Sequence, residues 1–326
     1  MNDQFGRTID YIRISVTDRC NLRCRYCMPS CGVESVGHDR ILRFDELFKL
    51  VELFARSGIK KVKLTGGEPL ARKGVVSIVE TIKHTPGIEQ VTMTSNGILL
   101  KEKLPQLVEA GLDGINISLD TLKRDRYEAV TGTDGLHAVL EAIDACMEYP
   151  QLKTKINAVT LADWNMDEIA DLAALARDRN MDVRFIEMMP IGLGKDYPGY
   201  DQNQVLQALE GAFGSAKVYE GPALGNGPAV YYELEGFCGR IGFISAMSHM
   251  FCGDCNRVRL TSEGFLKPCL QYAYGVDLRQ LLRDGADDES LLKAIEEGIY
   301  RKPRNHDIAS NNEDGKDDSH MSSIGG

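Results

Sequence analysis

Cysteine thiols are the side chains with the clearest chemical pattern in this chain of 326 residues. Seven of its nine cysteines fall into two short groups. The first begins Cys-x3-Cys-x2-Cys, and the second is Cys-x2-Cys with a further cysteine fourteen residues later. In a chain without export features, clustered cysteines indicate metal or redox chemistry. The groups comprise Cys20, Cys24, Cys27 and Cys31, and then Cys252, Cys255 and Cys269.

Each group can supply three thiolates to an iron–sulfur cluster. Three cysteines on a compact loop can bind three irons of a cubane, which leaves the fourth iron open for a cofactor or substrate. A structural zinc site is the alternative, but zinc usually takes four protein ligands and only His38 lies near the first group. Cys31 is expected to stay outside the ligand set. The isolated Cys146 and Cys238 are expected to be small, buried apolar residues.

The elements that must position these groups alternate between β-rich and amphipathic segments. Six strand–helix units in succession predict a parallel sheet with helices outside it. Right-handed crossovers would curl such a sheet, so the predicted fold class is α/β with a partial (β/α)6 TIM-like barrel. Strands are predicted over 11–17, 60–65, 90–94, 114–119, 153–161 and 182–187, and helices over 44–57, 75–83, 101–110, 136–147 and 166–179.

Unusual polar residues follow five of the predicted strands. In parallel α/β barrels the active site lies at the C-terminal ends of the strands. The first strand leads into the first cysteine group, and the second leads into Gly66-Gly67-Glu68-Pro69. The third, fourth and sixth lead into residues 94–97, 116–120 and 187–190. Their convergence on one rim predicts a single functional site there.

The pattern changes after about residue 215. Residues 221–228 form a loop rich in glycine and proline, and 230–234 and 240–244 are predicted to be short strands, antiparallel to each other. The second cysteine group follows, then helices over 277–283 and 290–300 and a polar stretch over 305–320. We therefore predict a core domain over 1–215 and a C-terminal region over 216–326 that carries a second cluster and closes the barrel mouth.

Composition excludes several functional classes. The chain is 43% apolar and 26% charged, which excludes disordered and collagen-like proteins. Its formal charge of −10 argues against general binding of nucleic acid. It has no apolar run of 18 residues and no basic-then-apolar start, so we expect neither a membrane span nor export. The expected location is the cytoplasm.

The first cysteine group resembles the signature of radical S-adenosylmethionine enzymes. Tyr26 fits the aromatic position before the last cysteine, and residues 66–69 match that superfamily's Gly-Gly-Glu-Pro element. The second group, with residues 256–259 (Asn-Arg-Val-Arg) and the terminal 325–326 (Gly-Gly), narrows the resemblance to the GTP 3′,8-cyclase family of molybdenum-cofactor biosynthesis. This resemblance covers nearly the whole chain.

The resemblance implies two [4Fe-4S] clusters, S-adenosylmethionine as cofactor and GTP as substrate. The first cluster, on Cys20, Cys24 and Cys27, would cleave the cofactor to a 5′-deoxyadenosyl radical that takes the 3′ hydrogen of GTP. The product would be (8S)-3′,8-cyclo-7,8-dihydroguanosine 5′-triphosphate, formed in a lyase reaction. The second cluster would be held by Cys252, Cys255 and Cys269, and its open iron would bind the guanine.

The resemblance also implies roles for individual residues. Lys63 departs from the family, where we expect arginine, so it keeps the charge but loses the bidentate fork of a guanidinium. The cofactor is expected to contact Tyr26, Gly67, Ser118 and Met189. GTP is expected to contact Arg13, Lys61, Lys63, Thr94, Lys155, Arg184, Arg257 and Arg259. Catalysis is expected to need Arg257, Arg259, Gly325 and Gly326, the last two at the end of a tail that reaches into the site.

The sequence is also compatible with two other functional classes. One is a different radical enzyme with an auxiliary cluster, such as a peptide-modifying enzyme, and another is a non-catalytic scaffold for zinc or a cluster. Under the leading hypothesis a reductant protein of unknown identity supplies electrons, and cyclic pyranopterin monophosphate synthase uses the product. No nucleic acid or membrane partner is expected, and the prediction leaves a homodimer open.

Overall fold

Alternating apolar residues in the first part of the chain build six parallel strands that follow one another in the sheet. The computed structural model describes residues 1–32, 36–37, 39–306, 317 and 321. Each of the six predicted strands is confirmed, with ends that differ from the prediction by two residues at most. The strands are β1 (Tyr11–Ser15), β2 (Lys61–Thr65), β3 (Gln90–Ser95), β4 (Gly114–Ser118), β5 (Lys153–Thr160) and β6 (Asp182–Glu187).

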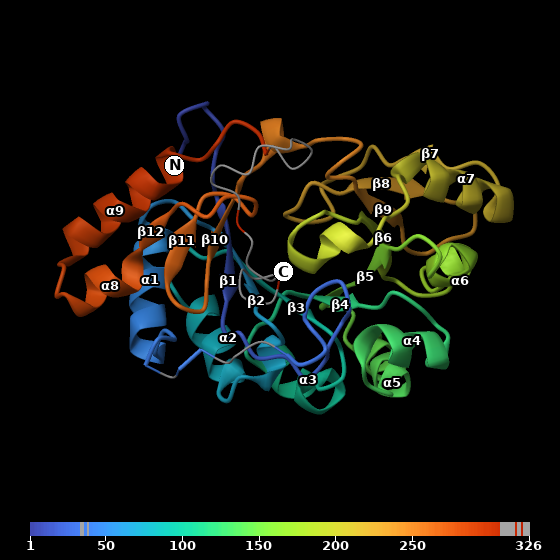
Figure 1. The fold of residues 1–326 in the computed structure, drawn as a ribbon, viewed down its shortest axis with the longest axis horizontal. Helices are drawn as coiled ribbons and strands as arrows, with labels where there is room; N and C mark the ends of the chain where they lie inside the picture. The colour runs from blue at the N-terminus through green and yellow to red at the C-terminus, as the bar shows by residue number, and fades with distance from the viewer. Residues whose placement is uncertain (33–35, 38, 307–316, 318–320, 322–326) are drawn as a thin grey trace.

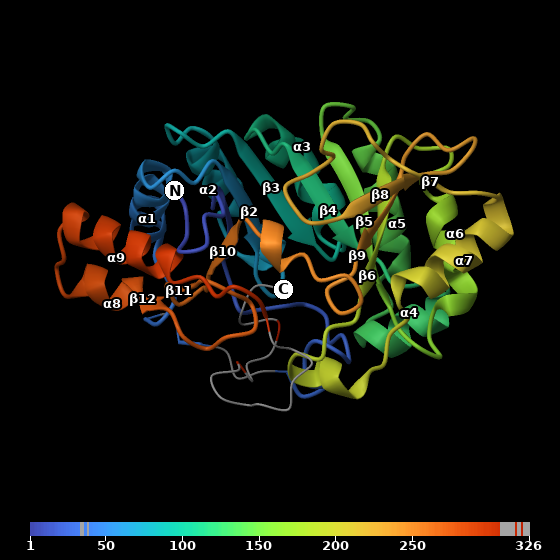
Figure 2. The same cartoon turned by 90° about the horizontal axis from the view of Figure 1, so that it is seen from above.

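The C-terminal part of the chain extends this sheet at both edges. The order is β12-β11-β10-β1-β2-β3-β4-β5-β6-β9-β8-β7 in the described residues, and β10 and β9 run parallel to β1 and β6. Figure 2 shows the two added sets at opposite sides of the sheet. The predicted antiparallel pair is confirmed as β8 and β9. The added strands are β7 (Lys217–Val218), β8 (Val230–Glu233), β9 (Ile241–Ile244), β10 (Arg257–Leu260), β11 (Phe265–Lys267) and β12 (Val276–Asp277).

The helices lie around the outside of the sheet, with α8 and α9 beside α1 (Figure 1). The predicted helix over 166–179 is shorter, because its last turn tightens to i→i−3 bonds such as Ala176 N to Ala173 O, 2.9 Å. Helices α4 and α7 were not predicted. The helices are α1 (Phe44–Arg56), α2 (Val75–Lys83), α3 (Leu100–Glu109), α4 (Arg124–Thr131), α5 (Leu136–Cys146), α6 (Ile169–Ala174), α7 (Gln202–Phe213), α8 (Leu278–Arg283) and α9 (Asp288–Tyr300).

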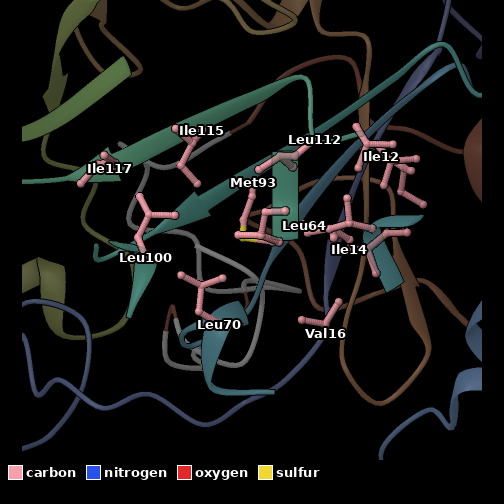
Figure 3. Close-up of a cluster of buried hydrophobic side chains, with 14 of the residues drawn as sticks. Ile12, Ile14, Val16, Leu64, Leu70, Met93, Leu100, Leu112, Ile115 and Ile117 are labelled. Atoms are coloured by element: carbon pink, nitrogen blue, oxygen red, sulfur yellow. The ribbon is translucent and has the colours of Figure 1, made fainter. Parts of the chain in front are cut away.

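The hydrophobic core fills the space between the sheet and these helices. Side chains alternate between the two faces of a strand, so one face of each strand is apolar and buried. Figure 3 shows a cluster of these buried apolar side chains. In it, residues of the strands lie close to Leu70, which follows β2 in the chain, and to Leu100, which follows β3. Its labelled strand residues are Ile12, Ile14, Leu64, Met93, Ile115 and Ile117. Burying this face leaves the opposite, polar face of the strands for the functional site.

The two isolated cysteines have different environments. Cys146 is 1% exposed within the core, as predicted. Cys238 is exposed, so the prediction that it is buried was wrong. It lies in the turn before β9, where Cys238 N donates to Arg177 O but the residue stays exposed. Among the described residues, no helix is long and apolar enough to cross a membrane.

Candidate functional site

A cavity of about 380 Å³ lies against the polar face of the sheet. Its walls come from β1 to β6, from β9 and β10, and from both cysteine groups. Most of the predicted site residues line it together, although they come from segments as distant as residues 13 and 269. They are Arg13, Cys20, Cys24, Tyr26, Cys27, Lys63, Gly67, Thr94, Ser118, Lys155, Arg184, Met189, Cys252, Cys255, Arg257, Arg259 and Cys269.

The first cysteine group forms a tight loop directly after β1. Cys27 N donates to Cys24 O at 2.9 Å, which folds the loop back on itself. Burial raises the pKa of the Cys24 thiol well above its usual range, and the nearby Cys27, Asp120 and Cys20 raise it further. Three mutually repelling, half-buried thiolates need positive charge at their centre. This donor set therefore fits an iron–sulfur cluster, which supplies that charge.

The second group also presents free thiols to the cavity. Burial raises the pKa of Cys255, but the Lys302 and Arg257 charges outweigh it and lower that pKa to about 7. Cys252 Sγ accepts a hydrogen bond from His306 N at 3.4 Å. Thiolates that face a cavity and accept backbone N–H bonds also fit a cluster. In the described part of the chain, no three His, Cys, Asp or Glu side chains are grouped to hold a single metal ion.

The Gly-Gly-Glu element lies against the backbone of the first cysteine loop. Gly67 N donates to Thr17 O and Glu68 N to Arg19 O, both at 2.8 Å. Gly66 has φ +157°, a backbone conformation that residues with a side chain rarely adopt. A Cβ added to Gly67 would lie 2.5 Å from Arg19 O. Glycine at 67 is therefore required by close backbone packing, whatever it binds.

Glu68 connects this element to β3 and to the cysteine loop. Its buried carboxylate accepts from Ser95 Oγ at 2.9 Å and from Asn96 N at 2.7 Å. Burial raises the pKa of Glu68 to about 7, although its hydrogen bonds lower it. Asn96 in turn donates to Cys20 Sγ at 3.9 Å and to Asn21 Oδ1 at 2.8 Å. Glu68 thus fixes a residue that touches the first thiol.

We expect Gly67→Ala to weaken S-adenosylmethionine binding about tenfold or more, since overpacking costs about 1–3 kcal/mol. The new methyl must displace the backbone of residues 18–19, directly before Cys20. Calorimetric titration of the reconstituted protein with the cofactor measures the change. Gly211→Ala is the matched control, because a Cβ there meets nothing within 4 Å. Equal affinity in both variants would contradict the expectation.

The other predicted cofactor contacts lie on the same wall of the cavity. Tyr26 Oη donates to Asp120 Oδ2 at 2.6 Å, which joins the cysteine loop to the end of β4. Burial raises the pKa of Asp120 to about 6, and its second oxygen accepts from Val159 N at 2.8 Å. Ser118 and Met189 line the cavity beside them. This wall therefore carries one aromatic ring held in a fixed position.

Positive side chains line the side of the cavity between the two cysteine groups. Lys63 is 8% exposed, and its ammonium has no hydrogen-bond or ion-pair partner among the described residues. Burial lowers its pKa well below the usual value, and the nearby Arg184, Arg13, Lys155 and Arg257 lower it further. A buried ammonium beside like charges favours binding of an anion.

Among these cations, Lys155 and Arg184 are held by neighbouring side chains. Lys155 bonds Asp182 and, at 2.8 Å, the Tyr231 hydroxyl. Arg184 donates twice to Asn157 Oδ1, at 2.9 and 2.6 Å. These contacts fix their positions, so the wall is already organised before any ligand binds. An anion would bind more tightly to this wall, because its cationic side chains need little rearrangement.

Three predicted site residues are not placed in the cavity. Lys61 does not line it; its ammonium lies 2.7 Å from Asp10 Oδ2 at the start of β2. Periodicity places Lys61 on the same face as Lys63 but cannot show that Asp10 pairs with it. Gly325 and Gly326 lie outside the described residues. Met321, from the same terminal segment, lines the cavity.

Sequence reasoning missed several lining residues. Residues 224–228 of the predicted loop reach the cavity, and Asn226 Nδ2 donates to Gln90 Oε1 at 2.6 Å, across the sheet. Lys302 and His306 also line it, from the segment after α9. A Lys-Pro pair after a helix gives no signal of a site. The sequence showed that the loop is rich in glycine, but it did not show that the loop reaches the cavity.

Two family models match most of this chain. The family model described as Radical SAM superfamily matches residues 14–176, and the one described as Molybdenum Cofactor Synthesis C matches residues 181–308. The chain is 47% identical to a GTP 3′,8-cyclase of Clostridium perfringens (strain 13 / Type A) over 327 residues, covering 100% of both chains. It is 45% identical to a GTP 3′,8-cyclase of Heliobacterium modesticaldum over 312 residues, covering 94% of each.

A solved structure shows the same fold at low identity. Streptococcus suis SuiB bound to S-adenosylmethionine superposes with a TM-score of 0.62 and 15% identity, covering 90% of this chain and 68% of that one. This likeness supports the α/β fold with its largely parallel sheet. The identity to relatives that this chain covers almost completely, together with the match to the Radical SAM superfamily model, places the chain in the GTP 3′,8-cyclase family of the radical S-adenosylmethionine superfamily.

Proposed function

We propose that this chain converts GTP to (8S)-3′,8-cyclo-7,8-dihydroguanosine 5′-triphosphate in the first step of molybdenum-cofactor biosynthesis. The observation that carries the proposal is one cavity lined by three cysteines from each group and by eight lysine and arginine side chains. When bound, S-adenosylmethionine and the first cluster supply a 5′-deoxyadenosyl radical. Membership of the GTP 3′,8-cyclase family supports this activity.

The chain's own residues would bind and orient GTP between the two cysteine groups. Cys20, Cys24 and Cys27 would hold the first [4Fe-4S] cluster, and Cys252, Cys255 and Cys269 the second. Lys63 and the arginines beside it would bind the triphosphate, whose charge would offset the mutual repulsion of those cations. The second cluster would lie in the C-terminal region, which in our proposal closes a partial (β/α)6 barrel.

Several parts of the proposal rest on the sequence alone. They are the division into a core over 1–215 and a C-terminal region over 216–326, the role of Gly325 and Gly326, and the cytoplasmic location. The reductant protein, the use of the product by cyclic pyranopterin monophosphate synthase, and a homodimer are further predictions. The topology bears on the division, because the C-terminal strands pair with both β1 and β6.

Anaerobic incubation with GTP, S-adenosylmethionine and a reductant tests the proposed function. Mass analysis should find the cyclised nucleotide together with 5′-deoxyadenosine, and the reconstituted protein should contain about eight irons, four for each cubane. A colourless protein that holds zinc would contradict the proposal and favour a scaffold. Deoxyadenosine without the cyclised nucleotide would favour a different radical enzyme.

We expect Lys63→Met to raise KM for GTP roughly tenfold to a hundredfold, because a hydrogen bond to a charged group contributes about 1.5–3 kcal/mol. A contact to a phosphate that does not react should change kcat less than KM. Lys61→Met is the matched control, because Lys61 lies on the same strand but outside the cavity. Steady-state assays at varied GTP measure both constants. Similar KM values for the two variants would count against Lys63 as a phosphate contact.

A further inference from the structure

The end of α9 and the segment 301–306 that follows it are hydrogen-bonded to the N-terminal segment and to the second cysteine group. Gln4 N donates to Tyr300 O at 3.1 Å. The Arg7 guanidinium donates to Cys252 O at 2.7 Å, to Pro303 O at 2.6 Å and to Arg304 O at 2.9 Å. Figure 1 shows the N-terminus beside α9. This segment therefore has a fixed position at the edge of the cavity.

Lys302 is the residue of this segment that reaches deepest. It is 3% exposed, and its ammonium donates to Arg257 O at 2.8 Å and to Pro268 O at 2.7 Å. Arg257 lies two residues after Cys255, and Pro268 directly precedes Cys269. One side chain thus joins the two strand segments that carry these cysteines. It lines the same cavity as the thiols.

The charge of Lys302 is not balanced by a carboxylate among the described residues. Its two hydrogen-bond acceptors are both backbone carbonyls, which offer only partial negative charge. A buried ammonium is costly unless an anion lies nearby. The cationic Arg257 and Arg259 line the same wall, so they cannot balance it. The three thiolates of the second group line the same cavity and can provide the missing negative charge.

We infer that Lys302 is a positioning residue for the second cluster, holding the Cys255 and Cys269 segments together and acting as the counter-ion of the cluster they bind. This inference rests on the proposed function, since it needs a second cluster. A cation beside a cluster favours its reduced form, which carries one more negative charge. Lys302 therefore makes the second cluster easier to load and easier to reduce.

The test uses the full chain with Cys20, Cys24 and Cys27 replaced by alanine, so that only the second group binds iron. In this parent we compare Lys302→Met, Lys302→Arg and Arg301→Met after anaerobic reconstitution with iron and sulfide. Arg301→Met is the matched control, because it removes a neighbouring charge from a side chain that is 76% exposed. Iron analysis measures loading, and titration followed by electron paramagnetic resonance measures the midpoint potential.

We expect Lys302→Met to lower the iron content, the midpoint potential or both, whereas Lys302→Arg and Arg301→Met stay close to the parent. If Lys302→Met matches Arg301→Met in both measurements, the inference is overturned. Equal loss of iron in Lys302→Met and Lys302→Arg also overturns the counter-ion role, because arginine keeps the charge. A parent that binds no iron would instead contradict the proposed second cluster itself.

Discussion

A Cys24→Ser chain, reconstituted anaerobically, is expected to leave S-adenosylmethionine intact, with cleavage reduced by more than about a hundredfold. Cys24 lies between the other two thiols of its loop, and burial already disfavours its anion. A serine hydroxyl is far less acidic than a thiol, so it would not replace the thiolate as an iron ligand. Chromatography of 5′-deoxyadenosine formed with dithionite as reductant measures the loss.

Cys31→Ser is the matched control for this expectation. Cys31 follows Cys27 by four residues but is exposed, does not line the cavity, and donates to Gly32 O at 3.4 Å. Its replacement should leave cleavage within about twofold of the parent, as for a surface substitution. Similar losses in Cys24→Ser and Cys31→Ser would mean that the loop uses a different ligand set. The comparison also tests the expectation that Cys31 is not a ligand.

Strong local patterns made the strands, and the residues that follow them, predictable. Apolar alternation fixed β1 to β6, and parallel pairing then had to bring residues 66–69 and the first cysteine loop to one rim. Gly67 is an example: its close approach to Arg19 O follows from two adjacent strand ends in register. Chemistry that depends on sequential strands in one sheet can therefore be read from the sequence.

Contacts between distant segments were not predictable in the same way. Residues 256–259 were visible as a charged motif, but the parallel pairing of β10 with β1, which sets Arg259 opposite Arg13, depends on the whole fold. Lys61 had a suitable type and face, yet Asp10 pairs with it outside the cavity. No sequence motif marked Lys302 as a residue of the site. Such positions are set by long-range packing, which local periodicity does not encode.

Cys255→Ser is expected to stop formation of the cyclised nucleotide while sparing much of the S-adenosylmethionine cleavage. Cys255 belongs to the group that faces the cavity from the β10 side, separate from the loop after β1. In the proposed function, its loss would disrupt the second cluster, whose open iron would orient the guanine, whereas the first cysteine group keeps all three of its thiols. The radical would then form without a correctly placed substrate, so cleavage would become uncoupled from cyclisation.

The decisive quantity is the ratio of 5′-deoxyadenosine to cyclised nucleotide, measured with GTP present. In the parent this ratio should be near the value set by one cleavage for each turnover. In Cys255→Ser the ratio should rise by about tenfold or more, because misplacing a substrate by about 1 Å can cost a hundredfold in rate. Cys238→Ser is the control, because that thiol is exposed and outside the cavity. If Cys255→Ser lowers both products equally, the two cysteine groups do not have separate roles. The proposed binding of GTP by the second group would then be wrong as well.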